Sequence, residues 1–188
     1  RTLFPYTTLF RSVTGVGLSS ICQEARGRLD DSHMLVNFGD VMLEQAATHD
    51  ITVDRDELST LSRTQTRRLQ RRAAEYVADQ AERGDILLST HLAVETQAGY
   101  VHGLPDGVLH DVAPTAFVLV EAAPGAILER RAESDRDLDT VTERQVAFEQ
   151  HLNRTVALEY ARERDAPIHF VENEGSVDEA AEHVATQL

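Results

Sequence analysis

The chain has 188 residues, enough for one domain with a sizeable core, and no apolar run approaches the roughly 20 residues of a membrane span, so we expect no membrane association. Its formal net charge of −14 excludes non-specific binding to nucleic acid, because the phosphates would be repelled. All 18 basic residues are arginine, and acidity without lysine resembles proteins of salt-adapted (halophile-like) cells, although a GC-rich genome would also favour arginine.

The first 12 residues look foreign to the rest of the chain. Residues 2–12 resemble the translation of a common sequencing-adapter oligonucleotide, so we predict that residues 1–12 are an artefact and that the native first strand is missing up to about Val13. Neighbouring threonines still allow this segment to pair as a strand. Arg11 is a poor occupant of a central strand buried on both faces, and we expect it to distort or expose such a strand.

A candidate phosphate-binding loop follows, in the stretch Val13-Thr-Gly-Val-Gly-Leu-Ser-Ser20. Two close glycines let backbone N–H groups turn inward, and a helix that begins near Ser19 points its positive end at an anion. Against the full pattern G-x-x-x-x-G-K-[ST], Ser12 holds the first glycine position and Leu18 the lysine position. Taken alone, the stretch is better explained as an ordinary glycine turn before a helix. The predicted phosphate-binding residues are Gly15, Val16, Gly17, Leu18, Ser19 and Ser20, with the Ser19 hydroxyl also reaching a phosphate-bound Mg²⁺.

Helical and strand patterns alternate along the rest of the chain. Apolar periodicity predicts helices over residues 19–29, 39–49, 64–83, 142–164 and 177–187, with two more that begin at 54 and 124. Short apolar runs predict strands over 34–37, 85–91, 116–120 and 168–171. This alternation indicates an α/β fold with a parallel sheet and right-handed crossovers. The single cysteine, Cys22, excludes an internal disulfide, fits a cytoplasmic location and is expected to be a buried small hydrophobe.

Polar residues gather after several of the predicted strands. They are residues 15–20, 37–40, 90–91 and 172–175. In parallel sheets, ligands bind beyond the carboxyl ends of the strands. Four such groups at one edge predict a site for a nucleotide or a phosphorylated ligand.

Several motifs of this chain resemble those of the archaeal adenylate kinases, in that family's order and spacing from about Val13 to the C-terminus. The motifs are Val36-Asn-Phe-Gly-Asp-Val-Met42, Asp54-Arg-Asp-Glu-Leu58, Gln70, Thr90-His91, Gly99-Tyr100, Gly103-Leu-Pro105, Arg136-Asp-Leu-Asp-Thr140 and Asn153-Arg154. The resemblance implies a P-loop kinase fold in one domain over residues 13–188, with a five-stranded parallel sheet and helices on both faces. It also implies a helical AMP-binding region at about 38–84 and a short lid at about 133–141. The implied reaction is ATP + AMP ⇌ 2 ADP with Mg²⁺, and relatives are often homotrimers.

The resemblance also assigns roles to individual residues. Arg130, Arg136 and Arg154 would close over the transferring phosphoryl group, whose charge the planar arginine fork matches. The AMP pocket would be formed by Asn37, Phe38, Gly39, Met42, Thr90, His91, Tyr100, Gly103, Leu104 and Pro105. Taken singly, His91 is equally well explained as a core histidine, and Tyr100 is better explained by packing.

The chain departs from the family's pattern at several positions. Compared with the usual V-T-G-V-P-G-V-G, three residues are missing between Gly15 and Val16, and Leu18 replaces the usual lysine. The remaining differences are Ser89 for an aspartate that supports Mg²⁺ binding, Ser59 and Glu95 for basic residues, and one arginine fewer in the lid. We therefore predict that this chain is a poor enzyme. Two alternatives stay open: a kinase for another small acceptor, and a catalytically impaired nucleotide-binding protein.

Overall fold

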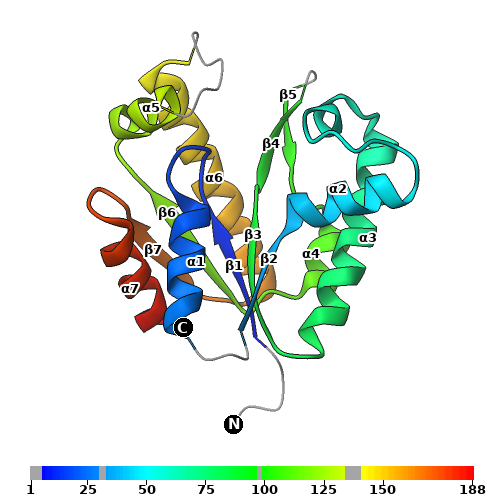
Figure 1. Cartoon of the computed structure of the whole chain (residues 1–188), viewed down its shortest axis with the longest axis horizontal. Coiled ribbons are helices and arrows are strands. Elements are labelled where there is room, and N and C mark those ends of the chain that lie inside the picture. The colour runs from blue at the N-terminus through cyan, green and yellow to red at the C-terminus, as the bar shows by residue number, and fades with distance from the viewer. Residues whose placement is uncertain (1–5, 30–32, 97–98, 134–140) are drawn as a thin grey trace.

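A five-stranded parallel sheet forms the centre of the protein, which we describe from a computed structural model covering residues 6–29, 33–96, 99–133 and 141–188 (Figure 1). The strands are β1 (Thr7–Arg11), β2 (His33–Asn37), β3 (Asp85–Thr90), β6 (Ala116–Glu121) and β7 (Ile168–Glu172), in the order β2-β3-β1-β6-β7. Every pairing between neighbours in this sheet is parallel. The predicted α/β class with a five-stranded parallel sheet is confirmed.

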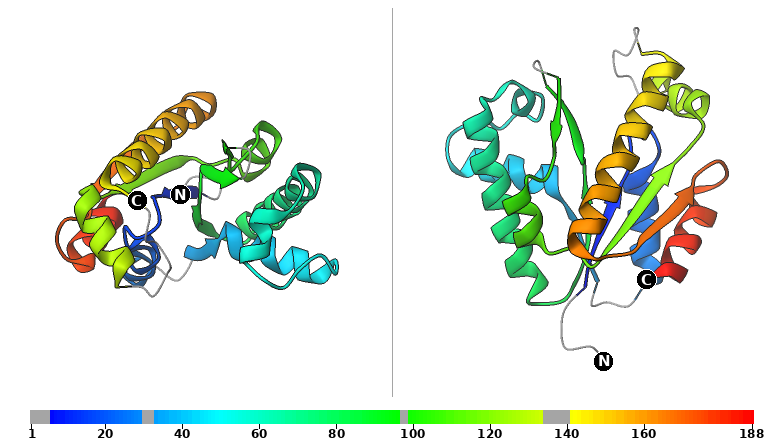
Figure 2. Two further views of the ribbon diagram at one scale, coloured as in Figure 1. Left: turned by 90° about the horizontal axis from the view of Figure 1, so that it is seen from above. Right: turned by 180° about the vertical axis from the view of Figure 1, so that it is seen from behind.

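Helices cover both faces of the sheet, as the views in Figure 2 show. The helices are α1 (Leu18–Arg28), α2 (Phe38–Thr48), α3 (Arg63–Ala81), α4 (Asp106–Val112), α5 (Pro124–Ala132), α6 (Glu143–Arg164) and α7 (Val177–Gln187). Successive strand residues alternate between the two cores, as the two-residue strand period requires. Leu9 packs with side chains of α2, α3, α4 and α6, whereas Phe10 packs with those of α1, α5 and α7.

Capping side chains fix where several of these helices begin. Asn37, Ser62, Thr142 and Ser176 each accept a hydrogen bond from a backbone N–H in the first turn of the helix that follows. Such caps satisfy donors that a helix start otherwise leaves open. No side chain caps α1, which begins directly after Gly17.

Residues 7–11, which we expected to be foreign, form the central strand of the sheet. β1 pairs with β3 on one side and β6 on the other, and the side chain of Arg11 is almost fully buried. The prediction that Arg11 would distort or expose the strand is therefore wrong. Its Nη2 donates to Asn153 Oδ1 and its Nη1 to the Thr90 carbonyl at 3.5 Å, and α6 covers the side chain. That residues 1–12 are foreign stays a prediction.

Four features of the fold differ from the sequence prediction. Helix α4 and a two-stranded antiparallel hairpin, β4 (Ala93–Thr96) and β5 (Gly99–His102), were not predicted. The helix expected from residue 54 is a 3₁₀ helix over Asp56–Thr60, and α3 ends at Ala81 rather than at residue 83. Among the described residues, no helix is long and apolar enough to cross a bilayer.

Cys22 lies on the buried face of α1 and is fully enclosed in the core that this helix covers, as predicted. Burial raises the pKa of its thiol to about 12, so the residue behaves as a small hydrophobe at neutral pH.

Candidate active site

The loops that follow the strands all emerge at one edge of the sheet, because the strands are parallel (Figures 1 and 2). The loop after β1 leads into α1, and the one after β2 leads directly into α2. The ends of β3, β6 and β7 bring Thr90, Glu121 and Asn173 to the same edge. This arrangement is the one that the sequence predicted for a ligand site.

The predicted phosphate loop is complete in length. Between Arg11, the last residue of β1, and Leu18, the first of α1, lie residues 12–17, as many as the pattern G-x-x-x-x-G contains. Gly15 and Gly17 have φ values of 89° and 88°, in the left-handed region that favours glycine. Because β1 is built from residues 7–11, the loop keeps six residues although its motif is shorter than that of the family.

Ser19 and Ser20 lie exposed in the first turn of α1, beside this loop. No group of three or more His, Cys, Asp or Glu side chains in the described part of the chain is placed to hold a metal ion. The Oγ of Ser89, where the family has aspartate, donates to the Val36 carbonyl at 3.4 Å. The Ser19 hydroxyl is an oxygen donor of the kind that Mg²⁺ accepts as a ligand.

Two of the three predicted catalytic arginines lie at this edge. Arg130 donates from Nη1 to the Val16 carbonyl at 3.4 Å and from Nη2 to the Asn173 carbonyl at 3.0 Å. It thus touches the phosphate loop directly. Arg136 lies outside the described residues.

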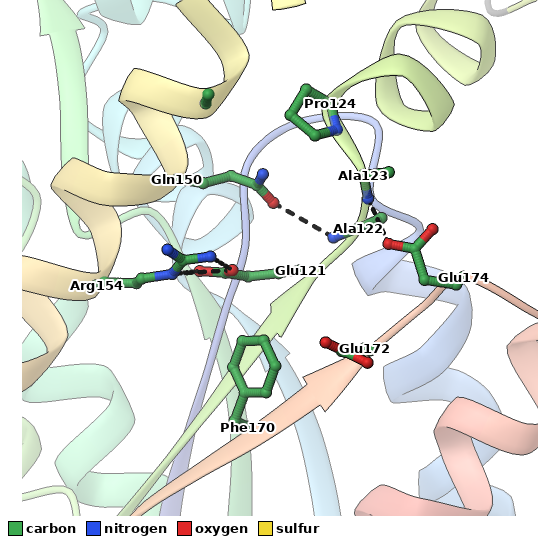
Figure 3. Close-up of a pocket in the computed structure, with 10 residues that line it drawn as sticks. Glu121, Ala122, Ala123, Pro124, Gln150, Arg154, Phe170, Glu172 and Glu174 are labelled. Carbon is green, nitrogen blue, oxygen red and sulfur yellow. Dashed lines mark hydrogen bonds and ion pairs between the residues drawn. The ribbon is translucent and has the colours of Figure 1, made fainter. Parts of the chain in front are cut away.

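Arg154, the third predicted arginine, lies on α6 and is held by a carboxylate at the end of β6. Its Nε donates to both oxygens of Glu121, at 2.7 and 3.0 Å, and its Nη2 also bonds to Oε2 (Figure 3). The side chain of Glu121 is only 5% exposed, whereas that of Arg154 is 51% exposed. The hydrogen bond with Glu121 raises the pKa of Arg154.

A pocket of about 290 Å³ opens beside this ion pair. Its lining includes Glu121, Gln150, Arg154, Phe170 and Glu174 (Figure 3). Gln150 accepts a hydrogen bond from the Ala122 N–H at 3.3 Å, and it lies one helical turn before Arg154 on α6. A single face of α6 therefore fixes the connection after β6 and presents the arginine.

The predicted acceptor residues begin at the end of β2. Asn37 caps α2 by accepting from the Asp40 N–H at 3.1 Å, and Asp40 forms an ion pair with Arg55. A Cβ on Gly39 would lie 3.1 Å from Nη1 of Arg55, so the absence of a side chain lets this arginine approach the helix start. Phe38 is buried in the core beneath them, and Met42 is partly buried against the same core.

His91 follows β3 on the opposite side of the predicted acceptor site. Although it keeps an exposed surface, burial among protein atoms lowers its pKa to about 4, and the positive charges of Arg11 and Arg55 add to the shift. The imidazole is consequently neutral at pH 7. Its neighbour Thr90 is buried.

The loop 103–105 is fixed by contacts from three directions. The Gly103 N–H donates to the Leu92 carbonyl at 2.6 Å, and the Gly103 carbonyl accepts from Gln70 Nε2 at 2.8 Å. Tyr160 on α6 donates to the Leu104 carbonyl at 2.6 Å. The side chain of Leu104 is fully buried, so it supports the loop from the core, and Pro105 precedes α4.

Tyr100 packs edge-on against Phe148 of α6, with ring centroids 5.8 Å apart. This contact fits the packing interpretation of Tyr100. The sequence named Asn173 only within the polar group 172–175, and it did not mark Glu121, Arg131 or Gln150 as parts of the site. The partners of these three residues lie 18 to 117 residues away along the chain, so no local pattern marks them.

Comparisons with known proteins agree with this geometry. Residues 12–145 match a protein family described as an AAA domain. A curated "Adenylate kinase" of Thermococcus kodakarensis is 37% identical over 170 residues, which cover 90% of this chain and 87% of the relative. The corresponding protein of Pyrococcus horikoshii is 38% identical with the same coverage, and that of Methanopyrus kandleri is 36% identical, with 89% of both chains covered.

Solved structures share the fold at low sequence identity. A gluconokinase from Sinorhizobium meliloti has a TM-score of 0.52 at 13% identity, with 97% of this chain and 91% of that chain covered. A sugar kinase from a Janibacter species has a TM-score of 0.55 at 12% identity, with 97% and 93% covered. At such identities the likeness extends to the fold alone.

Proposed function

The chain belongs to the adenylate kinase family, and on that premise we propose that it catalyses reversible phosphoryl transfer from ATP to AMP, giving two molecules of ADP. The observation that carries the proposal is the meeting of a six-residue glycine loop, Arg130 and Arg154 at one edge of the sheet. Phosphoryl transfer needs two nucleotides in line and positive charge around the moving group. The glycine loop supports binding of one nucleotide at this edge, and the two arginines support the need for positive charge.

The donor nucleotide would bind with its phosphates on the loop 12–17 and the start of α1. Backbone N–H groups there, together with the positive end of the helix, favour an anion. Ser19 would be the protein ligand of the Mg²⁺ bound with ATP, and the ion would add positive charge near the phosphates.

Arg154 would meet the transferring phosphoryl group from α6. Its Nε and Nη2 are occupied by Glu121, and no hydrogen bond from its Nη1 is seen to any described residue. The ion pair thereby orients the guanidinium while leaving one edge for the phosphates. Arg130 would act from the other side, next to the loop.

AMP would lie between the start of α2 and the end of β3. At pH 7 the neutral His91 offers hydrogen bonds rather than charge. Arg55, which pairs with Asp40 beside Gly39, would supply positive charge on this side of the site. The Ser59 and Glu95 positions, basic in relatives, supply no positive charge here.

The direct test is to incubate the chain with ADP and Mg²⁺ and to measure the ATP and AMP formed. The reverse reaction should accept AMP well in preference to CMP, UMP and non-nucleotide acceptors. Efficient use of another acceptor, with AMP left unused, would replace this proposal with that of a different small-acceptor kinase.

Leu18 and Ser89 favour a second candidate, a nucleotide-binding protein with weak turnover. Leucine gives no charge where the phosphate-loop pattern has lysine, and the Ser89 hydroxyl cannot replace a carboxylate near Mg²⁺. Calorimetric binding of ATP without measurable turnover would identify this candidate. Because the loop has its full length, Leu18→Lys alone should then raise turnover; no gain would place the defect elsewhere.

A further inference from the structure

Two backbone carbonyl groups of the loop 12–17 accept hydrogen bonds from side chains that belong to other parts of the chain. The Thr14 carbonyl accepts a hydrogen bond from Arg131 Nε at 2.7 Å. The Val16 carbonyl accepts from Asn173 Nδ2 at 2.7 Å and, more weakly, from Arg130 at 3.4 Å. Arg131 belongs to α5, and Asn173 follows β7, so elements beside the loop brace it in addition to its own Val16 N–H to Val13 carbonyl bond at 3.4 Å.

These bonds also fix the direction of two N–H groups. In a planar trans peptide, the carbonyl of one residue and the N–H of the next point in opposite directions. Holding the carbonyls of Thr14 and Val16 against the braces therefore turns the N–H groups of Gly15 and Gly17 away from them. Within the described ranges of the chain, no hydrogen bond from either of these N–H groups is seen. N–H groups that point together out of such a turn form an anion-binding concavity.

Both braces are rigidly placed. Asn173 is 2% exposed; its own N–H donates to the Glu121 carbonyl at 2.8 Å, and its carbonyl accepts from Arg130. Arg131 is 5% exposed, and its Nη2 pairs with Glu149 of α6 at 3.0 Å. The side chain of Arg131 cannot swing away without breaking its bond to Glu149, and the backbone hydrogen bonds of Asn173 fix the position from which its side chain extends.

The two glycines make room for these braces. A Cβ on Gly15 would lie 2.7 Å from Cγ of Arg131, and one on Gly17 would lie 3.0 Å from Nδ2 of Asn173. Both glycines therefore serve two purposes, the left-handed backbone and the close approach of a brace.

We propose that Asn173 and Arg131 are positioning residues for the nucleotide: they hold the Val16 and Thr14 carbonyls outward so that the Gly17 and Gly15 N–H groups point at its phosphates. This inference rests on the proposed function only for the identity of the donor nucleotide. Since Leu18 stands where the pattern has lysine, backbone donors carry a larger share of phosphate binding here than in a loop with that charge.

The test compares ATP affinity with fold stability in the full chain. Asn173→Asp keeps the size of the side chain but replaces the donor to Val16 with a carboxylate that repels the same carbonyl. Arg131→Lys keeps the positive charge facing Glu149 but lacks the Nε donor to Thr14. We expect the Kd and the KM for ATP to rise about ten- to a hundredfold in each variant, as expected for losing an aligned donor to an anion, with the KM for AMP unchanged.

Ser176→Ala is the matched control in the same connection after β7. Ser176 caps α7 and bonds to Glu179, and no hydrogen bond described in the structure joins it to the loop. This variant should lower the melting temperature and leave the Kd for ATP unchanged. It thus separates a general loss of stability from a loss of loop orientation.

The outcomes are distinct. Should Asn173→Asp fail to fold, Arg131→Lys decides, and an ATP affinity within twofold of the unaltered chain in the folded variants would overturn the inference. Absence of ATP binding by the unaltered chain would overturn it as well. ATP binding that depends on both braces, without transfer to AMP, would support the inference and overturn the proposed function alone.

Discussion

His91 is a residue whose charge the fold suppresses. Its pKa of about 4 in the folded chain lies below the ordinary value of 6.5, through burial and the charges of Arg11 and Arg55. Between these two pH values the unfolded chain binds a proton that the folded chain does not. The free energy of unfolding should therefore fall as the pH decreases from about 6.5 to about 4.

Denaturant unfolding of the chain and of His91→Gln at several pH values measures how much the titration of His91 contributes to the free energy of unfolding. Carboxylates titrate in the same range in both proteins, so their contribution cancels in the difference. We expect the difference in the free energy of unfolding to change across that window and to be constant above pH 7. Parallel curves throughout would show that His91 titrates normally.

Gly103 is required by a contact that the sequence does not reveal. A Cβ at this position would overlap the carbonyl oxygen of His91, a backbone atom that cannot move without shifting the end of β3. Gly103→Ala should thus lower the free energy of unfolding by about 1–3 kcal/mol or more, as overpacking does. Gly107→Ala in α4 is the matched control, because no atom lies within 4 Å of its added Cβ. Equal thermal stability of both variants would contradict the close contact.

The family resemblance places Gly103 in the predicted acceptor site, but the structure gives another reason for a glycine there: the close approach of the His91 backbone in the connection after β3. The same limit applies to Asn173 and Arg131. Local patterns show which residues turn or cap, whereas pairs such as Asn173 and Val16 exist only after the sheet has formed.

At the scale of single elements, helix α6 carries both core residues and side chains that lie at the candidate active site. Asn153 and Arg154 both lie on it, and they bond to Arg11 and Glu121 at the ends of two adjacent strands. The long apolar period of α6 could be predicted from the sequence, and so could the capping Thr142 at its start. Helix α4, with only seven residues and an internal glycine, is too short to show a period, and the four-residue strands of the hairpin are equally weak signals.

Breaking the pair of Arg154 and Glu121 should lower both the rate of turnover and the free energy of unfolding. Arg154→Ala should reduce turnover by a factor on the order of 10³, the scale of a charge-stabilising arginine. Because the Arg154 side chain is half exposed, its removal would by itself change the free energy of unfolding little. Because Glu121 is buried, however, the variant leaves a carboxylate without its partner, and we expect a loss of about 1–3 kcal/mol in the free energy of unfolding.

Adding Glu121→Gln to Arg154→Ala separates the two effects. The double variant should regain most of the stability, since a neutral amide costs less to bury, but none of the turnover. Chemical unfolding and initial rates are measured on the unaltered chain, the two single variants and the double variant, which together form a double-mutant cycle. Recovery of turnover in the double variant would exclude a direct role for Arg154 in phosphoryl transfer.

At the scale of the whole molecule, the net charge of −14 opposes the compact state through self-repulsion. Raising NaCl from 0.1 to 1 M shortens the Debye length from about 10 to about 3 Å, which screens that repulsion. The melting temperature should rise over this range. A variant with Glu75→Gln and Asp79→Asn, exposed like charges one turn apart on α3, should gain less from salt. Equal gains, or no gain in the unaltered chain, would show that salt acts through another property.

Alternating periodicities predict four strands of the sheet, and the resemblance to the kinase family implies five, but neither identifies the central strand. Residues 7–11 lack the continuous apolar run of a strand buried on both faces and end in Arg11. Pairing with β3 and β6 outweighs this weak local preference, because the buried backbone groups of both neighbours need partners. The fold therefore accommodates residues 7–11 as its central strand, although their local sequence pattern does not favour such a strand.

A strand held in this way can change in sequence without loss of the fold. The two neighbouring strands supply backbone partners on both sides, so the segment between them needs only to be extended and to place apolar side chains such as Leu9 and Phe10 in the two cores. Selection for folding alone would then act weakly on the last residue of the strand, Arg11, whereas selection for chemistry at that edge of the sheet would act on it directly.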